Sequence, residues 1–171
     1  MLIIRLLSNA IKSKLPKMSR PFLPLFIEGE VIKGFGRGSK ELGCPTANYP
    51  LSVVKTLPEQ IEPGVYYGFA KIGGGPVYKM VANIGWCPFY KNEEMSIETH
   101  VIHYCGPDFY GEYLKTIIVG YLRAEMNFDS LDKLILAINA DIANAITFLD
   151  FPDAQKLVNH DFFVSSKLGE K

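Results

Sequence analysis

Alternating and clustered apolar positions predict a chain built mainly of β-strands in its first two thirds. The strand-like stretches are rich in β-branched and aromatic residues and are bounded by Gly, Pro or Asn. The turn at residues 73–76, Gly-Gly-Gly-Pro, predicts that the strands on either side of it form a hairpin. The predicted strands cover residues 25–33, 64–72, 78–84, 95–104 and 115–122.

The connections between these strands predict the fold class. No strand is followed by a crossover helix, which argues against a parallel βαβ arrangement. Several antiparallel strands at this spacing predict a mainly β fold, a small closed barrel with Greek-key-like strand order. Residues 51–62 are expected to form an irregular connection, because Pro50, Pro58 and Pro63 punctuate it.

One long amphipathic helix is predicted after the strands. Asp129 is the expected N-cap, and a shorter helical stretch is expected over residues 152–158. The apolar stripe of the long helix should pack on the barrel, and its other side should be solvated. The stripe consists of Leu131, Leu134, Ile135, Ile138, Ile142 and Ile146, and the residues expected in solvent are Asp132, Lys133, Asn139 and Asp141.

The amino-acid composition indicates the number of domains, the kind of partner and the redox compartment. The 171 residues suit one domain, and 18 basic residues balance 18 acidic ones, so no overall field indicates a nucleic-acid partner. The three cysteines, Cys44, Cys87 and Cys105, form no metal-type pair, and their number is odd. They indicate a reducing compartment and are expected to be buried or half-buried thiols.

Residues 1–20 differ from the rest of the chain. They contain five basic residues and no acidic one, and their apolar run is too short to span a membrane. One interpretation is a mitochondrial transit peptide, and the other is a disordered extension of a cytoplasmic protein. We expect residues 21–171 to form the functional domain, with a cytoplasmic location and a mitochondrial one as the alternative.

A glycine-rich stretch is the first candidate for chemistry. Four glycines and two basic residues lie between residues 34 and 43. Backbone N–H groups and a lysine can bind phosphate there, although a mobile hairpin explains the same glycines. Thr46 and Asn48 follow, and in an extended chain both would lie on one side. Their neutral oxygen atoms beside a phosphate loop indicate Mg²⁺ held together with a nucleotide.

Glu98 is the second candidate. In a strand, Glu98 and His100 share one face, and Ile97, Thr99 and Val101 share the other. If the apolar set faces the core, Glu98 is an ordinary exposed carboxylate. If the strand lines a cleft, Glu98 can act as a general base toward an alcohol.

Several motifs in order resemble the riboflavin kinase family. They are GFGRGSKELGCPTAN, GVYYGFAKI, KMVANIGWCPFYKN, SIETHVIH, DFYGE, IIVGYLR and NFDSL, and together they cover the chain from Phe22 onward. The resemblance implies the monofunctional eukaryotic type, which transfers the γ-phosphate of ATP to the terminal ribityl hydroxyl of riboflavin. The products would be FMN and ADP. Because the chain has no second nucleotide motif, FMN and not FAD is the expected final product.

The resemblance also implies site residues. Glu98 would be the catalytic base, Thr46 and Asn48 would bind Mg²⁺ (with Zn²⁺ or Mn²⁺ as alternatives), and Arg123 and Phe128 would bind the flavin. The residues implied for ATP are Gly34, Gly36, Gly38, Lys40, Thr46, Val101, His103 and Tyr110. Without the family, Arg123 reads as a surface arginine, His103 as a structural histidine and Phe128 as a buried core residue.

Two other classes of function compete with a kinase. A flavin-binding barrel without catalysis would leave Thr46, Asn48 and Glu98 idle. A barrel for single-stranded nucleic acid needs a basic groove with interleaved aromatics, and the basic residues instead concentrate at the N-terminus. We therefore expect ATP and riboflavin as substrates, no nucleic acid, no membrane association and a monomer.

Overall fold

The computed structural model describes residues 20–34, 45–86 and 94–164. They form one antiparallel sheet of six strands in the order β1-β6-β3-β4-β5-β2. The strands are β1 (Leu25–Glu30), β2 (Ala47–Asn48), β3 (Gly64–Ile72), β4 (Val77–Trp86), β5 (Met95–Val101) and β6 (Tyr113–Arg123). The predicted mainly β, antiparallel class and the β3–β4 hairpin are confirmed.

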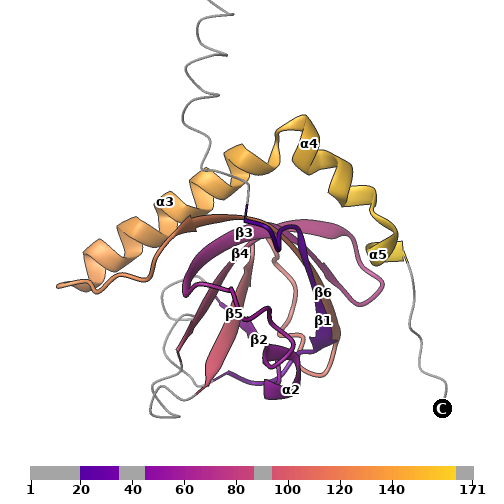
Figure 1. Cartoon of the computed structure of the whole chain (residues 1–171), viewed down its shortest axis with the longest axis horizontal. Coiled ribbons are helices and arrows are strands. Elements are labelled where there is room, and N and C mark those ends of the chain that lie inside the picture. The colour runs from indigo at the N-terminus through magenta and orange to yellow at the C-terminus, as the bar shows by residue number, and fades with distance from the viewer. Residues whose placement is uncertain (1–19, 35–44, 87–93, 165–171) are drawn as a thin grey trace, which may run out of the picture.

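The sheet curls into a barrel-like shape below the C-terminal helices (Figure 1). Within the described residues, the chain just after β1 meets the other edge strand, β2, through one bridge, in which the Ile32 nitrogen donates to the Asn48 oxygen at 2.9 Å. The paired part of β1 ends at Glu30 and not at residue 33 as predicted. The barrel is therefore only partly closed.

Strand alternation divides the buried residues between two cores. Tyr66 and Ala70 of β3 face the barrel interior, with Ile97 of β5. Tyr67 and Phe69, the alternate residues of β3, face outward into a second cluster. Because β3 is covered on both faces, its burial is nearly continuous along the strand.

The predicted long helix is present as α3 (Leu131–Leu149). Its N-cap is Ser130, whose Oγ accepts from the Lys133 nitrogen at 3.3 Å, and not Asp129 as predicted. Asp129 instead pairs with the Lys133 ammonium at 2.8 Å. Shorter helical segments are α2 (Leu51–Val54), α4 (Pro152–Gln155), η2 (Lys156–Asn159) and α5 (Asp161–Val164). The connection expected to be irregular thus contains a helical turn.

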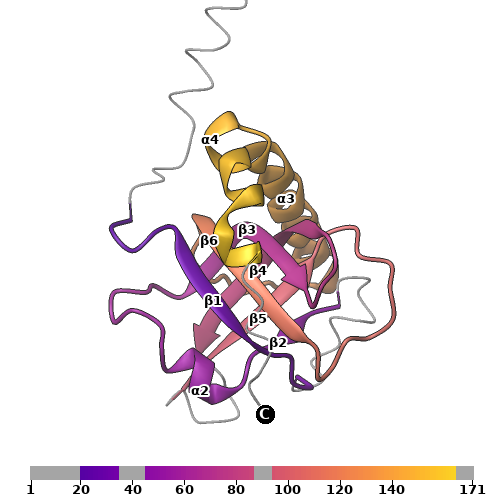
Figure 2. The same cartoon turned by 90° about the vertical axis from the view of Figure 1, so that its right-hand side faces the viewer.

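Helix α3 covers the outer face of the sheet (Figures 1 and 2). Ala145 and Leu149 are fully buried against this face. Two predictions about the helix are wrong. Leu131 is 56% exposed, and Asp141, which was expected in solvent, is only 7% exposed because it binds a side chain of the sheet.

Lysines on the outer face bind the C-terminal helical segments. Lys71 donates to the Phe163 carbonyl at 2.9 Å, and Lys115 donates to the Phe162 carbonyl at 2.8 Å. Lys79 donates to the Ile146 carbonyl at 3.0 Å, near the C-terminal end of α3. These cations satisfy carbonyl groups that a helix terminus leaves without an intrahelical partner. The C-terminal segments are therefore held on the sheet by polar contacts as well as by apolar packing.

The first described residue, Arg20, already belongs to the fold. Its guanidinium pairs with Glu62 at 2.6 Å and lies 3.9 Å from the centre of the Tyr121 ring. The pairing lowers the pKa of Glu62 below its ordinary value. Cys105 is exposed, contrary to the expectation of buried thiols, and Cys44 and Cys87 lie outside the described residues.

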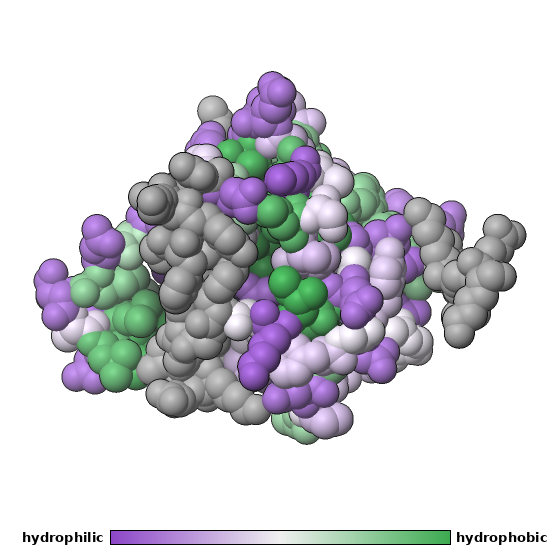
Figure 3. Space-filling view, turned by 90° about the horizontal axis from the view of Figure 1, so that it is seen from below, coloured by the Kyte–Doolittle hydropathy of each residue, from purple (hydrophilic) through white to green (hydrophobic). Residues whose placement is uncertain are grey.

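Two surface properties complete the description. Exposed apolar side chains occur where α3 begins, at Met126, Leu131 and Leu136, and apolar surface is visible at that end of the molecule (Figure 3, left). Within the described residues no single helix has the length and apolar character to cross a membrane. The pair α3 and residues 152–164 meets that test only together, across a bend of 79°.

Candidate active site

A row of side chains crosses five strands on the outer face of the sheet. Asn48 of β2 lies opposite Glu98 of β5, and Glu98 lies opposite Asn83 of β4. Asn83 pairs with Val65 of β3, which pairs with Arg123 at the end of β6. Directly opposite residues in an antiparallel sheet point to the same side. The register therefore brings Glu98 and Arg123, which are 25 positions apart in sequence, to one surface.

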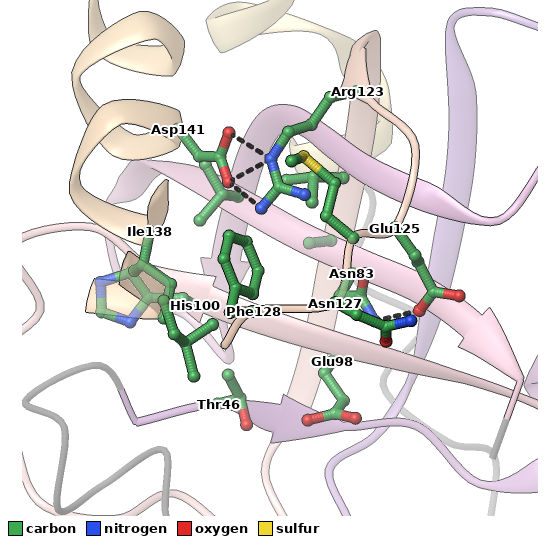
Figure 4. Close-up of a pocket in the computed structure, with 15 residues that line it drawn as sticks. Thr46, Asn83, Glu98, His100, Arg123, Glu125, Asn127, Phe128, Ile138 and Asp141 are labelled. Carbon is green, nitrogen blue, oxygen red and sulfur yellow. Dashed lines mark hydrogen bonds and ion pairs between the residues drawn. The ribbon is translucent and has the colours of Figure 1, made fainter. Parts of the chain in front are cut away.

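The described residues enclose a pocket of about 480 Å³ on this surface, within the size range of small-molecule sites. Figure 4 shows Thr46 and Glu98 along one side of it and Arg123 and Asp141 along the other. The other lining residues are Val65, Val81, Ala82, Asn83, His100, Glu125, Met126, Asn127, Phe128, Leu134 and Ile138.

Two elements outside the sheet form the second wall. The connector, which we define as residues 124–128 between β6 and α3, contributes four side chains. The first half of α3 contributes Leu134, Ile138 and Asp141, which recur at helical spacing. A pocket forms here because α3 and the connector leave a space over β4 and β5.

The structure combines the two interpretations of Glu98: the apolar residues of β5 face the core, and Glu98 faces a pocket. Ile97, Thr99 and Val101 face the barrel core, at 1%, 1% and 6% exposure. Glu98 and His100 are on the opposite face, which lines the pocket. The His100 Nδ1 lies 3.0 Å from the Pro45 carbonyl oxygen, a contact that connects β5 to the segment carrying Thr46. Glu98 is therefore a lining carboxylate of a cleft.

Arg123 is fixed by a forked interaction with Asp141. Its Nε donates to Oδ1 at 3.0 Å, and its Nη2 donates to Oδ2 at 2.7 Å. The pair is largely withdrawn from solvent, with side-chain exposures of 24% and 9%. A bidentate Arg–carboxylate pair fixes the orientation of the guanidinium and also strengthens the interaction. The Phe128 ring lies 5.7 Å from the guanidinium carbon, so both residues predicted to bind the flavin lie in one corner of the pocket.

Thr46 and Asn48 lie close to Glu98 in the structure. Thr46 lines the pocket, and Asn48 is 5% exposed beside Glu98. A Cβ atom at Gly34 would overlap the Asn48 amide, so a larger residue at position 34 would require that amide to shift. Neutral oxygen atoms next to a carboxylate suit a hard divalent cation. The donor set thus fits Mg²⁺, and nothing in it identifies the metal.

A different kind of metal site is not present in the described ranges. Residues 20–34, 45–86 and 94–164 contain no group of three or more His, Cys, Asp or Glu placed to hold an ion.

Of the residues predicted to bind ATP, Thr46 lines the pocket and Gly34 ends a described range, and the other six fall into two groups. Val101, His103 and Tyr110 do not line the pocket. The Val101 side chain packs in the core, which leaves only its backbone for a ligand. His103 has a φ of 60° in a turn, and Tyr110 is 50% exposed. Gly36, Gly38 and Lys40 lie outside the described residues.

The loop that carries Tyr110 adjoins the start of the glycine-rich stretch. The Gly111 nitrogen donates to the Val31 carbonyl at 2.9 Å, and the Val31 nitrogen donates to the Glu112 carbonyl at 2.8 Å. Tyr110 and Gly34 thus belong to neighbouring segments of one edge of the barrel.

Comparison with known proteins gives the family. The sequence matches the Flavokinase family, described as riboflavin kinase, over residues 22–149. The chain belongs to the riboflavin kinase family. It is 56% identical to a riboflavin kinase of Mus musculus and 54% identical to one of Homo sapiens, in each case over 145 residues, 85% of this chain and 94% of the relative. This coverage corresponds to the monofunctional eukaryotic type.

A solved structure agrees with this family assignment. The riboflavin kinase from Trypanosoma brucei matches with a TM-score of 0.69 and 27% identity, over 85% of this chain and 92% of that one. The riboflavin kinase fold therefore extends over most of the chain. Members of the family are kinases, and kinases that use ATP generally work with a divalent metal.

The lining residues that were not predicted include Asn83, Glu125 and Asp141. A signal for Asp141 was present, because it stands three residues after Ile138 and four before Ala145, on the buried side of α3. Asn83 stands between the apolar residues Ala82 and Ile84 in β4, a strand that also contains Lys79. Glu125 is in an irregular connector, where no periodicity places a side chain.

Proposed function

We propose that this protein transfers the γ-phosphate of ATP to the terminal ribityl hydroxyl of riboflavin, giving FMN and ADP. The observation that carries the proposal is the position of Glu98. It lines a pocket of suitable size for a flavin and lies beside Asn48, next to the start of the glycine-rich stretch. Family membership supports the same reaction.

The walls of the pocket suit the two parts of riboflavin. Val65, Val81 and Ile138 supply apolar surface for the isoalloxazine ring. Arg123 and Phe128 bound that surface at one corner, and Arg123 is held by Asp141 in a fixed direction. The ribityl chain then extends toward Glu98 and Thr46, the polar side of the pocket.

Glu98 acts as the general base in this proposal. As the terminal hydroxyl oxygen attacks the γ-phosphorus, its O–H bond breaks and Glu98 accepts the proton. A bond forms between that oxygen and phosphorus, and the bond from phosphorus to the β–γ bridging oxygen breaks, so ADP leaves. Phosphoryl transfer needs little covalent chemistry from the protein, so positioning and charge dominate.

Thr46 and Asn48 are proposed to hold Mg²⁺, with Zn²⁺ or Mn²⁺ as the alternative metals. A divalent cation there, when bound, offsets the negative charge of the phosphate oxygens. The Asn48 side chain is kept in place by its burial and by the close approach of Gly34. Gly34 with Gly36, Gly38 and Lys40, and the edge near His103 and Tyr110, are proposed to bind the nucleotide.

The direct test is to incubate the purified protein with riboflavin, ATP and Mg²⁺ and to separate the flavins by chromatography. The proposal expects FMN, with formation that depends on both ATP and the metal. Riboflavin that binds but stays unchanged would favour a flavin carrier and contradict the proposal. Accumulation of FAD would contradict FMN as the final product.

The cytoplasmic location, the mitochondrial alternative and the monomeric state remain predictions. The basic residues on which the location depends lie largely within residues 1–19, outside the described part of the chain. Imaging of the full chain and of a version that begins at Met18, each with a C-terminal fluorescent tag, tests the location. Mitochondrial signal from the full chain alone would overturn the cytoplasmic prediction.

A further inference from the structure

A hydrogen bond ties the connector to the sheet beside the candidate base. The Asn83 Nδ2 of β4 donates to the Glu125 Oε1 of the connector at 3.0 Å (Figure 4). Asn83 lies directly opposite Glu98 on the neighbouring strand. This bond therefore joins the far wall of the pocket to the strand position next to Glu98.

Gly85 shows a second adaptation of the sheet to the Glu125 carboxylate. Gly85 is two residues after Asn83, so both positions are on the same face of β4. A Cβ atom at Gly85 would overlap the carboxylate of Glu125. One position on the strand thus donates a hydrogen bond to this carboxylate, and the other leaves room for it.

Arg123 provides a second attachment of the connector to the sheet. At the start of the connector, the Arg123 Nη1 donates to the Ala124 carbonyl at 3.0 Å, and Arg123 is itself bound to Asp141. Between Glu125 and the beginning of α3, the residues Met126, Asn127 and Phe128 all line the pocket. Glu125 therefore attaches the chain just before these three side chains to β4, and Phe128 also lies near Arg123.

We propose that Asn83 and Glu125 form a positioning pair that holds the connector as a wall of the acceptor pocket and so sets the affinity for riboflavin. The proposal rests on the function proposed above, and it assigns neither residue a contact with the reacting atoms. The pair acts on the riboflavin KM, with the ATP KM and kcat changed little.

Charge makes the identity of Asn83 important. Glu98 and Glu125 both line the pocket, and Asn83 is the neutral donor beside each of them. Aspartate at this position would replace the donor by a third carboxylate and repel Glu125. Asn83→Asp should therefore displace the connector more than Asn83→Ala does.

A double-mutant cycle tests the pair. Asn83→Ala and Glu125→Ala should each raise the riboflavin KM by about three- to tenfold, within the usual net value of one hydrogen bond. The double variant should be no worse than either single variant, because both remove the same bond. Glu125→Gln retains an acceptor oxygen and should lose less affinity than Glu125→Ala. Thermal unfolding midpoints should stay close to that of the wild type.

Two outcomes would overturn the proposal. Additive effects of Asn83→Ala and Glu125→Ala would show that the residues act separately. A change in kcat or in the ATP KM of the same size as the change in the riboflavin KM would also contradict a role confined to the acceptor pocket.

Gly85→Ala provides an independent variant that removes no functional group. The added methyl group should displace the Glu125 carboxylate and reproduce the riboflavin KM of Glu125→Ala. An unchanged riboflavin KM in Gly85→Ala would contradict the proposed role of the Glu125 carboxylate's position against Gly85.

A binding measurement separates this proposal from the kinase assignment. Riboflavin binding to each variant can be followed without ATP by quenching of flavin fluorescence. Weaker binding by Asn83→Asp than by Asn83→Ala supports the positioning pair even if the wild type forms no FMN. Equal binding by wild type and all variants, together with normal FMN formation, would reject the pair and leave the kinase function intact.

Discussion

Helix α3 covers the outer face of the sheet in two different ways. Its C-terminal half packs directly on the strands, where Ala145 and Leu149 meet Tyr67 and Ile117 with almost no exposed surface. Its N-terminal half stands over a pocket of about 480 Å³. One helix and one sheet face therefore form both a dry core and a ligand site.

The difference arises from a few side chains in the same periodic pattern. Along the buried side of α3, Asp141 occurs where the stripe would otherwise continue with an apolar residue, and it binds Arg123. On the strands below, Asn83 and Glu98 replace the apolar residues found under the C-terminal half. Polar side chains line the pocket under the N-terminal half of α3. Close-packed apolar side chains under the C-terminal half fix the helix on the sheet and so hold the pocket wall in position.

The largest expected effect is a loss of turnover in the pocket under the N-terminal half of α3. Glu98→Gln should lower kcat by about 10²–10⁴-fold, the usual contribution of a general base. Riboflavin binding and the unfolding midpoint should change little, because the amide has nearly the same shape. Steady-state kinetics with flavin chromatography measure the effect.

The matched control is Glu94→Gln, which makes the same change at the residue before β5 and outside the pocket. Its kcat should equal that of the wild type. A Glu98→Gln enzyme with near-normal turnover would remove Glu98 from the mechanism.

The next largest effect is a loss of stability where the C-terminal half of α3 packs on the sheet. Leu149→Ala removes a side chain with 0% exposure and should lower the free energy of unfolding by about 2–5 kcal/mol. Chemical denaturation measures this change. At a temperature where the variant is folded, its kcat and both KM values should match the wild type. Selective loss of riboflavin affinity in folded Leu149→Ala would show that the two halves are not separate.

Asp141→Ala links the two halves and should have an intermediate effect. It leaves the Arg123 cation without its partner in a largely buried position, which should cost about 1–3 kcal/mol of stability after allowance for the 24% exposure of Arg123. Riboflavin affinity should fall as well, since Arg123 loses its fixed direction. Urea unfolding and fluorescence titration measure the two changes.

Asp150→Ala is the control for this ion pair. Asp150 pairs with Lys79 at 2.6 Å but is 64% exposed, so its removal should cost less than about 1 kcal/mol. Riboflavin affinity should not change. Equal losses of stability in Asp141→Ala and Asp150→Ala would contradict the special position of Asp141.

The smallest effect is a pH dependence of stability that arises under the C-terminal half of α3. Burial raises the pKa of Tyr67, which packs against Phe148 with ring centres 5.5 Å apart. The folded state therefore keeps the neutral phenol at a pH where the unfolded chain already loses its proton. The contribution to stability is complete below a pH of about 10 and is lost as pH rises above it.

Urea unfolding between neutral and strongly alkaline pH checks this sign. Stability should decline above the ordinary tyrosine pKa, and the decline should be shallower in Tyr67→Phe. A decline of the same slope in both proteins would assign it to other groups.

The sequence predicted those features that depend on period and composition. Five of the six strands, the β3–β4 hairpin and α3 follow from alternation and helical spacing, and Glu98 and His100 were correctly placed on one face of β5, whereas the two-residue strand β2 was not predicted. These properties are local, so a single stretch of sequence contains enough information to define them.

The features that were missed depend on register and tertiary contact. Asp141 was expected in solvent because aspartate on a helix usually is, and only the position of Arg123 explains its burial. The bond between Asn83 and Glu125 joins residues 42 positions apart, one of them in a connector without periodicity. The N-cap was displaced by one residue, since Asp129 and Ser130 are both good capping residues.

The most direct test of the account is a crystal structure of the protein with riboflavin and Mg-ADP. The account predicts the isoalloxazine ring between the connector and strands β4 and β5, close to Arg123 and Phe128. It predicts the terminal ribityl hydroxyl within about 2.6–3.2 Å of a Glu98 oxygen, the reach of a general base. Riboflavin bound at another surface, or with its ribityl end turned away from Glu98, would contradict the central claim.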